Sequence, residues 1–144
     1  MLTTLLLWLT MSTSQIQYSD LVGEWQLVYF DGIEKVKASP QYRSSGPEFR
    51  SGVEAKINFR LENTVYKFKT GDILEYTDFE KFQIVLKQAK IELADGNIIT
   101  IHEKDEIKKA QIVELDGKRL VIQPIGEEAS GGKLVFERIQ QKKE

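Results

Sequence analysis

Apolar and polar side chains alternate in residues 23–30. Successive side chains of an extended chain point to opposite faces, so Trp25, Leu27 and Tyr29 share one face. Polar glutamate and glutamine side chains lie between them at the start of the stretch. This pattern predicts a first β-strand over residues 23–30, with the face of Trp25 turned inward.

Residues 53–61 have the most regular alternation in the chain. Charged or polar residues separate their apolar side chains, which are Val53, Ala55, Ile57, Phe59 and Leu61. Strict alternation over such a length is typical of a strand with one buried face. We therefore expect a β-strand over residues 53–61, with Phe59 on its inner face.

Residues 33–52, which lie between these two stretches, have no sustained hydrophobic period. They contain prolines, glycines and scattered serines, which are typical of loops. A loop of this length is uncommon in a compact domain unless it has a role such as covering a binding mouth. The alternatives are a lid, to which Tyr42 and Phe49 would contribute aromatic groups, and a plain surface insertion.

Turn residues divide most of the remaining chain into short strands. The alternating or β-branched stretches lie at residues 64–69, 73–76, 98–103, 107–115, 118–125 and 133–139. The pair Asp116-Gly117 is a strong hairpin signal between two of them. Strands that follow one another through hairpins, with no helix expected among them, indicate an all-β fold, either an up-and-down antiparallel barrel or a sandwich.

Residues 77–93 fit two interpretations. Thr77 to Glu80 matches a helix capping box, and apolar residues follow at helical spacing. The alternative is a pair of strands with residues 87–90 as a turn or bulge. We favour strands, because Ile84 and Val85 are β-branched and both neighbouring segments are predicted strands.

The last predicted strand separates a barrel from a sandwich. Leu134, Phe136 and Arg138 share one of its faces, and Arg138 stands at its end. In an up-and-down barrel with an even number of strands, the last strand pairs antiparallel with the first and closes the sheet. Arg138 would then meet Trp25, where a guanidinium can lie over the indole and donate hydrogen bonds to nearby carbonyls.

Gly23-Glu24-Trp25 at the first strand and Leu134-Val135-Phe136-Glu137-Arg138 at the last resemble the lipocalins, and more closely the small bacterial lipocalin-like domains of the calycin superfamily. The resemblance implies an up-and-down antiparallel β-barrel of eight to ten strands, closed at the Trp25 end and open at the other. The fatty-acid-binding proteins have a similar glycine–tryptophan start and ten strands. Their two-helix lid between the first two strands is not matched by residues 33–52, which counts against them.

The resemblance also implies that the barrel holds a small hydrophobic ligand. Tyr29 and Tyr66 are candidates for its polar contacts, because each combines an apolar ring with one hydroxyl. The further candidate ligand-binding residues are aromatic groups of the inner face and of the loop, namely Tyr42, Phe49, Phe59 and Phe68. Gly23, Trp25 and Arg138 are expected to have structural roles.

The side chains expected inside the barrel are large, and a second function is therefore possible. Nearly all of these side chains are large, and an eight-stranded barrel can be filled by its own side chains. A solid barrel would serve as a protein–protein interaction or structural module of the cell envelope. A protein partner is then expected in place of a small ligand.

Composition narrows the chemistry. The chain has 144 residues, with 20 Lys and Arg against 22 Asp and Glu, so it lacks the basic field that binding to nucleic acid requires. It has no cysteine and one histidine, His102, which stands in a charged segment where a solvated turn is the favoured interpretation. We therefore expect no enzymatic activity, no cofactor and no metal site.

The N-terminus bears on location. Residues 1–11 are an apolar run of the length of a signal-peptide core, too short for the ~20 residues that span a bilayer. Small Ser12 and Ser14 fit the positions before a cleavage site, although the run has no preceding Lys or Arg. We expect residues 1–14 to be a signal peptide and residues 15–144 to form one exported, periplasmic or secreted barrel domain. The alternative is a retained segment that packs on the barrel.

Overall fold

A computed structural model describes the chain except for residues 1–14, 82, 96, 127–131 and 141–144. The predicted signal peptide therefore lies outside the described residues, as do most of the loop before the last strand and the end of the polar tail. None of the helices within the described ranges has both the length and the apolar character needed to cross a membrane.

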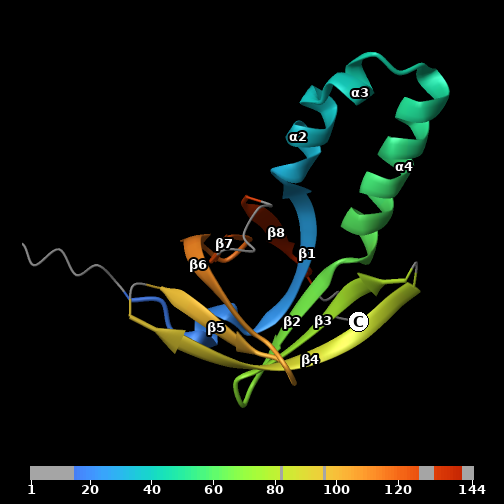
Figure 1. The fold of residues 1–144 in the computed structure, drawn as a ribbon. Helices are drawn as coiled ribbons and strands as arrows, with labels where there is room; N and C mark the ends of the chain where they lie inside the picture. Colours follow the sequence, from blue (N-terminus) through green and yellow to red (C-terminus); the bar gives the residue numbers. More distant parts are fainter. Residues whose placement is uncertain (1–14, 82, 96, 127–131, 141–144) are drawn as a thin grey trace, which may run out of the picture.

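The described residues form a closed antiparallel barrel in which each strand pairs with its neighbours in sequence (Figure 1). Its strands are β1 (Gly23–Phe30), β2 (Val65–Lys69), β3 (Ile73–Glu80), β4 (Gln83–Ala94), β5 (Ile98–His102), β6 (Ile107–Leu115), β7 (Arg119–Ile125) and β8 (Leu134–Arg138). β8 pairs antiparallel with β1 and closes the barrel. The predicted up-and-down barrel is confirmed, with the lower of the two expected strand counts among the described residues.

The core fills the closed end of the barrel with its own side chains. Trp25, Leu27, Leu74, Leu120 and Phe136 are each at most 1% exposed and come from strands all around the barrel. Since the interior of an eight-stranded barrel is just wide enough for its side chains, this packing leaves the closed end solid. Any ligand must therefore bind toward the open end.

A β-bulge changes which side chains of β1 face inward. The pairing of β1 with β8 shifts between Leu27 and Tyr29, so one extra residue stands in β1. Beyond the bulge, Phe30 is buried at 8% exposure, whereas Tyr29 pairs with a residue on the outer face of β8. The expectation that Tyr29 shares the inner face of Trp25 is therefore wrong.

Residues 32–63 form a helical arm that projects from the open end of the barrel (Figure 1). The arm consists of α2 (Gly32–Ala38), α3 (Pro40–Arg43) and α4 (Pro47–Asn63), and a short helix, α1 (Tyr18–Leu21), precedes β1. The predicted loop over residues 33–52 and the predicted strand over residues 53–61 are both wrong. The expectation of a fold without helices is wrong for the same segment.

The alternation in residues 53–61 comes from two stripes of one helix. Val53, Ile57 and Leu61 stand four residues apart and are half-buried, and Ile57 and Leu61 pack against the core of the barrel. Ala55 and Phe59, also four residues apart, lie on another side of the helix. Both stripes fall on odd positions, which imitates the period of a strand.

The start of α4 and its composition explain why the helix forms. Gly46 is the N-cap and Pro47 occupies the first turn, where its missing N–H costs nothing. Glu48 follows in the same turn, where a negative charge is favourable. Glutamate, alanine, lysine, arginine and leucine, all good helix formers, supply much of the remainder.

From the sequence, we expected no helices in residues 33–52, between the first two strands. We expected no match to the two-helix lid of the fatty-acid-binding proteins, and that expectation is wrong. The helical arm lies between the first two strands, where their lid lies. The described strands nevertheless number eight rather than ten.

The ambiguous residues 77–93 are strands, as favoured from the sequence. β3 and β4 pair continuously from Ile73 opposite Lys90 to Glu80 opposite Gln83. The turn or bulge expected at residues 87–90 is absent from this ladder, so that detail is wrong. β5 pairs with β4 only from Lys90 onward. Among the described residues, the first half of β4 therefore has β3 as its one strand partner.

Candidate ligand-binding cleft

The closed end of the barrel is held by a contact between the first and last strands. Trp25 is opposite Arg138, whose guanidinium lies 4.3 Å from the centre of the indole. The same guanidinium donates hydrogen bonds to the backbone oxygens of Gly117, Val22 and Asp20 at 3.0, 2.8 and 3.0 Å. Arg138 therefore ties the end of β8 to the turn before β7 and to the entry of β1.

Gly23 leaves room for this arginine. A Cβ at position 23 would lie 2.5 Å from Nη1 of Arg138, and the residue has a φ of +137°, which side chains rarely adopt. The glycine and the tryptophan two positions later thus serve one arrangement. Neither residue lines the cleft-forming open end, and their expected structural role stays a prediction.

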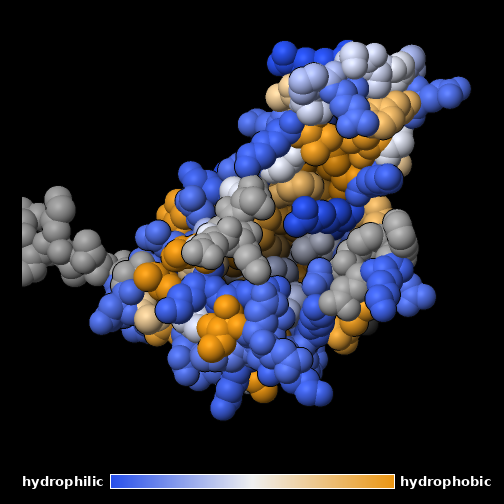
Figure 2. Space-filling view, viewed as in Figure 1, coloured by the Kyte–Doolittle hydropathy of each residue, from blue (hydrophilic) through white to orange (hydrophobic). Residues whose placement is uncertain are grey.

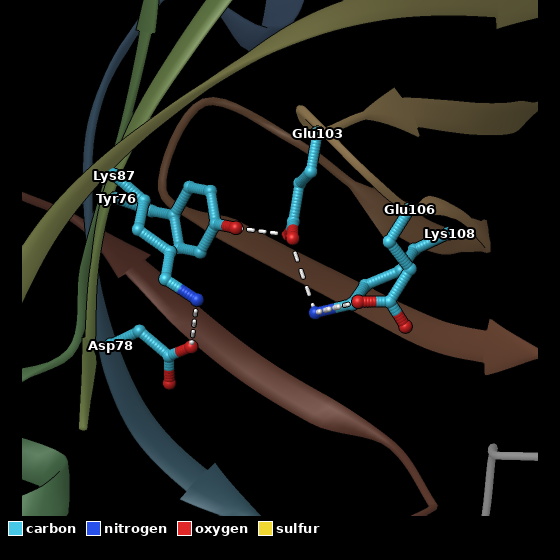
Figure 3. Close-up of polar contacts among 6 residues, drawn as sticks. All are labelled: Tyr76, Asp78, Lys87, Glu103, Glu106 and Lys108. Carbon is cyan, nitrogen blue, oxygen red and sulfur yellow. Dashed lines mark hydrogen bonds and ion pairs between the residues drawn. The ribbon is translucent and has the colours of Figure 1, made fainter. Parts of the chain in front are cut away.

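Polar side chains occupy the inner face toward the open end, above the apolar core (Figure 3). Lys87 Nζ lies 3.1 Å from an oxygen of Asp78, and Lys108 Nζ lies 3.2 Å from Glu103. Tyr76 donates a hydrogen bond to the same carboxylate of Glu103. Lys108 Nζ also lies 3.9 Å from Glu106, so one ion pair and one cluster of three charged groups occupy this half of the barrel.

The tyrosines of this region are held in their neutral form. Burial raises the pKa of the Tyr66 hydroxyl to about 12, with the charge of Asp78 adding to the rise and that of Arg60 opposing it. Burial and the bond to Glu103 raise the pKa of Tyr76 above its ordinary range. Both hydroxyls therefore stay protonated at neutral pH and can donate hydrogen bonds.

A cleft of about 620 Å³ lies between α4 and the β3–β4 hairpin. Ala55, Lys56, Phe59 and Arg60 of α4 form one wall, and Asn63 and Thr64 lie at the end of that helix. Thr77, Asp78 and Ile84 form the opposite wall. We call this space the cleft; none of these residues belongs to the buried core of the barrel.

Side chains of the barrel fix the last turn of α4, where backbone oxygens lack partners within the helix. Gln26 donates hydrogen bonds to the backbone oxygens of Leu61 and, at 3.2 Å, Thr64. Thr77 donates one to the backbone oxygen of Asn63. Because β1 and β3 both bind the helix end, the cleft has fixed walls where α4 meets the barrel.

One of the candidate ligand-binding residues lines the cleft, and a second lies close to charged residues of its walls. Phe59 lines it, but from a helix and not from the inner face of a strand. Tyr66 lies on the inner face of β2, with its ring 4.7 Å from that of Phe136 and its hydroxyl within reach of the charges of Asp78 and Arg60. Whether either contacts a ligand stays a prediction.

The other four candidates lie elsewhere. Tyr42 and Phe49 belong to the helical arm away from the cleft, where Tyr42 packs against the Arg50 guanidinium at 5.4 Å. Phe68 is 2% exposed and belongs to the core. Tyr29 lies beyond the bulge, where partial burial and a hydrogen bond with Glu34 raise the pKa of its hydroxyl.

Phe59 is the one cleft residue that the sequence indicated as a ligand contact, and three of the others are charged, namely Lys56, Arg60 and Asp78. The strand interpretation assigned the first two to a solvated outer face. A helix over residues 47–63 would have placed Lys56 and Arg60 one turn apart beside Phe59. The signal for that helix was Gly46-Pro47 followed by Glu48.

The only histidine lies apart from the cleft. Its Nε2 atom is 3.3 Å from Glu92, on the outer face of β5 and β4. Within the part of the chain that the structure describes, no three histidine, aspartate or glutamate side chains gather as metal ligands. The polar side-chain groups at the cleft are one amine, one guanidinium, one amide, two hydroxyls and one carboxylate, which suit binding by charge and hydrogen bonds.

Comparison with known proteins adds a similarity of overall shape. No family model and no curated protein matches the chain. Among solved structures, the chain is similar to a complex of bovine odorant-binding protein with a selenium-containing odorant, at 14% identity and a TM-score of 0.49, over 90% of this chain and 76% of that one. The class of the fold follows from the topology itself: an eight-stranded up-and-down barrel of lipocalin-like type, closed by Trp25 and Arg138.

Proposed function

We propose that this protein binds a small apolar or amphipathic molecule in the cleft between α4 and the β3–β4 hairpin. The observation that carries the proposal is the cleft itself, whose 620 Å³ falls within the range of roughly 300–1,000 Å³ typical of ligand pockets. Ala55, Phe59 and Ile84 give it apolar walls. The sequence placed the ligand inside the barrel, but the filled core favours the cleft.

The binding role is proposed as non-catalytic. His102 lies on the outer face beside Glu92, and the charged pairs of the inner face engage one another, which favours positioning over proton transfer. Cleavage of residues 1–14 and export of the remaining chain stay predictions.

The proposal predicts that the neutral fluorophore N-phenyl-1-naphthylamine binds the protein saturably with increased fluorescence. Phe59→Ala should weaken its affinity about tenfold, because an aromatic wall of the cleft is lost. Phe49→Ala is a matched control on the same helix, since Phe49 is 45% exposed and Phe59 44% exposed, and only Phe59 lines the cleft. Fluorescence titration of the wild type and both variants makes the measurement.

Two outcomes would contradict the proposal. No saturable binding to the wild type would remove the ligand site altogether. Equal losses in Phe59→Ala and Phe49→Ala would place the fluorophore on the general apolar surface of the helical arm. Circular dichroism of both variants checks that α4 remains folded.

A solid barrel that binds a protein partner is the second candidate, and exposed apolar side chains favour it. Leu86 is 66% exposed and Ile107 is 63% exposed, and apolar side chains gather along the helical arm (Figure 2). Exposed apolar surface of this kind often marks interaction sites. Sedimentation velocity without added ligand separates the candidates, because self-association together with no fluorophore binding would favour this one.

A further inference from the structure

We propose that the cleft selects ligands with a single negatively charged head group, so that the ligand is an anionic amphiphile such as a medium-chain carboxylate. This inference rests on the proposed function and deepens it by naming the chemical class of the ligand. It comes from the charges on the cleft walls and from the way their partners are arranged.

Two cations stand on the α4 wall. Lys56 and Arg60 are one helical turn apart and both line the cleft. The guanidinium of Arg60 lies 4.3 Å from the centre of the Phe30 ring, and Phe30 is 8% exposed. A cation held on a buried ring is already positioned, so it loses less conformational entropy on meeting a ligand.

The carboxylate on the opposite wall already has a partner. Asp78 lines the cleft, but Lys87 lies 3.1 Å from it and is not a cleft residue. Among the residues whose side chains the structure describes, no ion pair engages Lys56 or Arg60. The cleft therefore presents two cations and one neutralised carboxylate to a ligand.

Backbone oxygens at the end of α4 would otherwise repel an anion. Asn63 donates to the oxygen of Phe59 at 2.8 Å, and Thr64 donates to that of Arg60 at 2.6 Å. Gln26 and Thr77 bind two further oxygens of the same turn. These hydrogen bonds engage four carbonyl oxygens of the helix end and so weaken their repulsion of an anion.

The apolar walls of the cleft favour a ligand that also has an apolar tail. Ala55 and Phe59 follow the same helix side, and Ile84 faces them from β4. An aliphatic chain can lie between these groups while a carboxylate reaches the fork of Arg60, whose planar geometry suits two parallel hydrogen bonds. Head and tail thus have separate partners within one cleft.

Displacement of bound N-phenyl-1-naphthylamine by three ligands of equal chain length tests the inference at neutral pH. The ligands are decanoate, 1-decanol and decyltrimethylammonium, which share a ten-carbon chain and carry a negative, a neutral and a positive head group. We expect decanoate to bind about tenfold more tightly than decanol, and the ammonium to bind least well. Added salt should reduce the preference for decanoate, because both cations are exposed.

Variants assign the preference to residues. Arg60→Gln and Lys56→Gln should each weaken decanoate several-fold, and leave decanol unchanged. Arg43→Gln is the matched control: Arg43 is exposed on α3 and outside the cleft, and its replacement changes the net charge equally. A loss of the same size in Arg43→Gln would mean that overall charge and not the cleft sets the preference, and would overturn the inference.

The results also distinguish this inference from the proposed function. Binding of the fluorophore with equal displacement by decanoate and decanol would overturn the anion preference and leave the cleft as a ligand site. Best displacement by decyltrimethylammonium would point to Asp78 as the head-group partner and overturn it as well. Absence of fluorophore binding would remove both proposals.

Discussion

Trp25→Ala is expected to destabilise the folded protein by about 3–5 kcal/mol, the usual cost of truncating a buried tryptophan. Trp25 is 0% exposed, and its indole Nε1 donates a hydrogen bond to the backbone oxygen of Leu21 at 2.8 Å. The variant loses the apolar contacts, the packing of α1 on the barrel and the aromatic surface under Arg138. Urea unfolding followed by circular dichroism measures the change.

Phe49→Ala is the control for that experiment. Phe49 is 45% exposed on the helical arm, so its loss should change the free energy of unfolding by about 0.5 kcal/mol or less. A Trp25→Ala protein that unfolds at the wild-type urea midpoint would contradict the role of Trp25 as the plug of the closed end.

Arg138→Lys should destabilise the protein by about 2–3 kcal/mol although the positive charge is kept. The guanidinium reaches three backbone oxygens, of Gly117, Val22 and Asp20, and an ammonium on a flexible stem cannot reproduce that fork. Urea unfolding gives the value directly. Arg119→Lys on β7 is the control, because Arg119 is exposed and has one ion pair, at 3.8 Å from Glu114.

A double-mutant cycle of Trp25→Ala and Arg138→Gln, in which glutamine removes the cation, separates the cation–π contact from the hydrogen bonds. Residues in contact should show a coupling energy of about 0.5–2 kcal/mol. Additive effects would mean that the arginine acts through its carbonyl partners alone. Equal stability of Arg138→Lys and the wild type would contradict the proposed closure.

The barrel could be predicted from the sequence because its strands obey local rules. Hairpin signals such as Asp116-Gly117 indicate the connections between strands. Leu134, Phe136 and Arg138 lie on the same face of the last strand, which predicts its pairing with β1. These features depend on period two and on turn chemistry, which act within a few residues.

The helical arm was misinterpreted because one pattern satisfies two periods. Apolar residues at every second position also stand four apart, so Val53, Ile57 and Leu61 form a helix stripe as readily as a strand face. The length of α4 and its start at Gly46-Pro47 decide for the helix. The sequence carries both signals, and alternation at every second position predicts the wrong one.

The bulge and the cleft depend on contacts between segments far apart in the sequence, and local sequence patterns do not predict such contacts. The register shift before Tyr29 exists only in the pairing of β1 with β8. Likewise, Arg60 of the helical arm and Asp78 of the β3–β4 hairpin line the same cleft although they are far apart in the sequence. Phe59 was named as a ligand contact on the premise of a strand, and it lines the cleft from a helix.

Amide NMR spectra recorded during titration with decanoate test the central claim, that the ligand site is the cleft at the open end and not the interior of the barrel. We predict shifts that saturate together and are concentrated in the second half of α4 and at Thr77, Asp78 and Ile84. Core positions near the closed end, such as Leu120 and Phe136, should stay unchanged. Shifts concentrated at those core positions, with α4 unaffected, would contradict the claim.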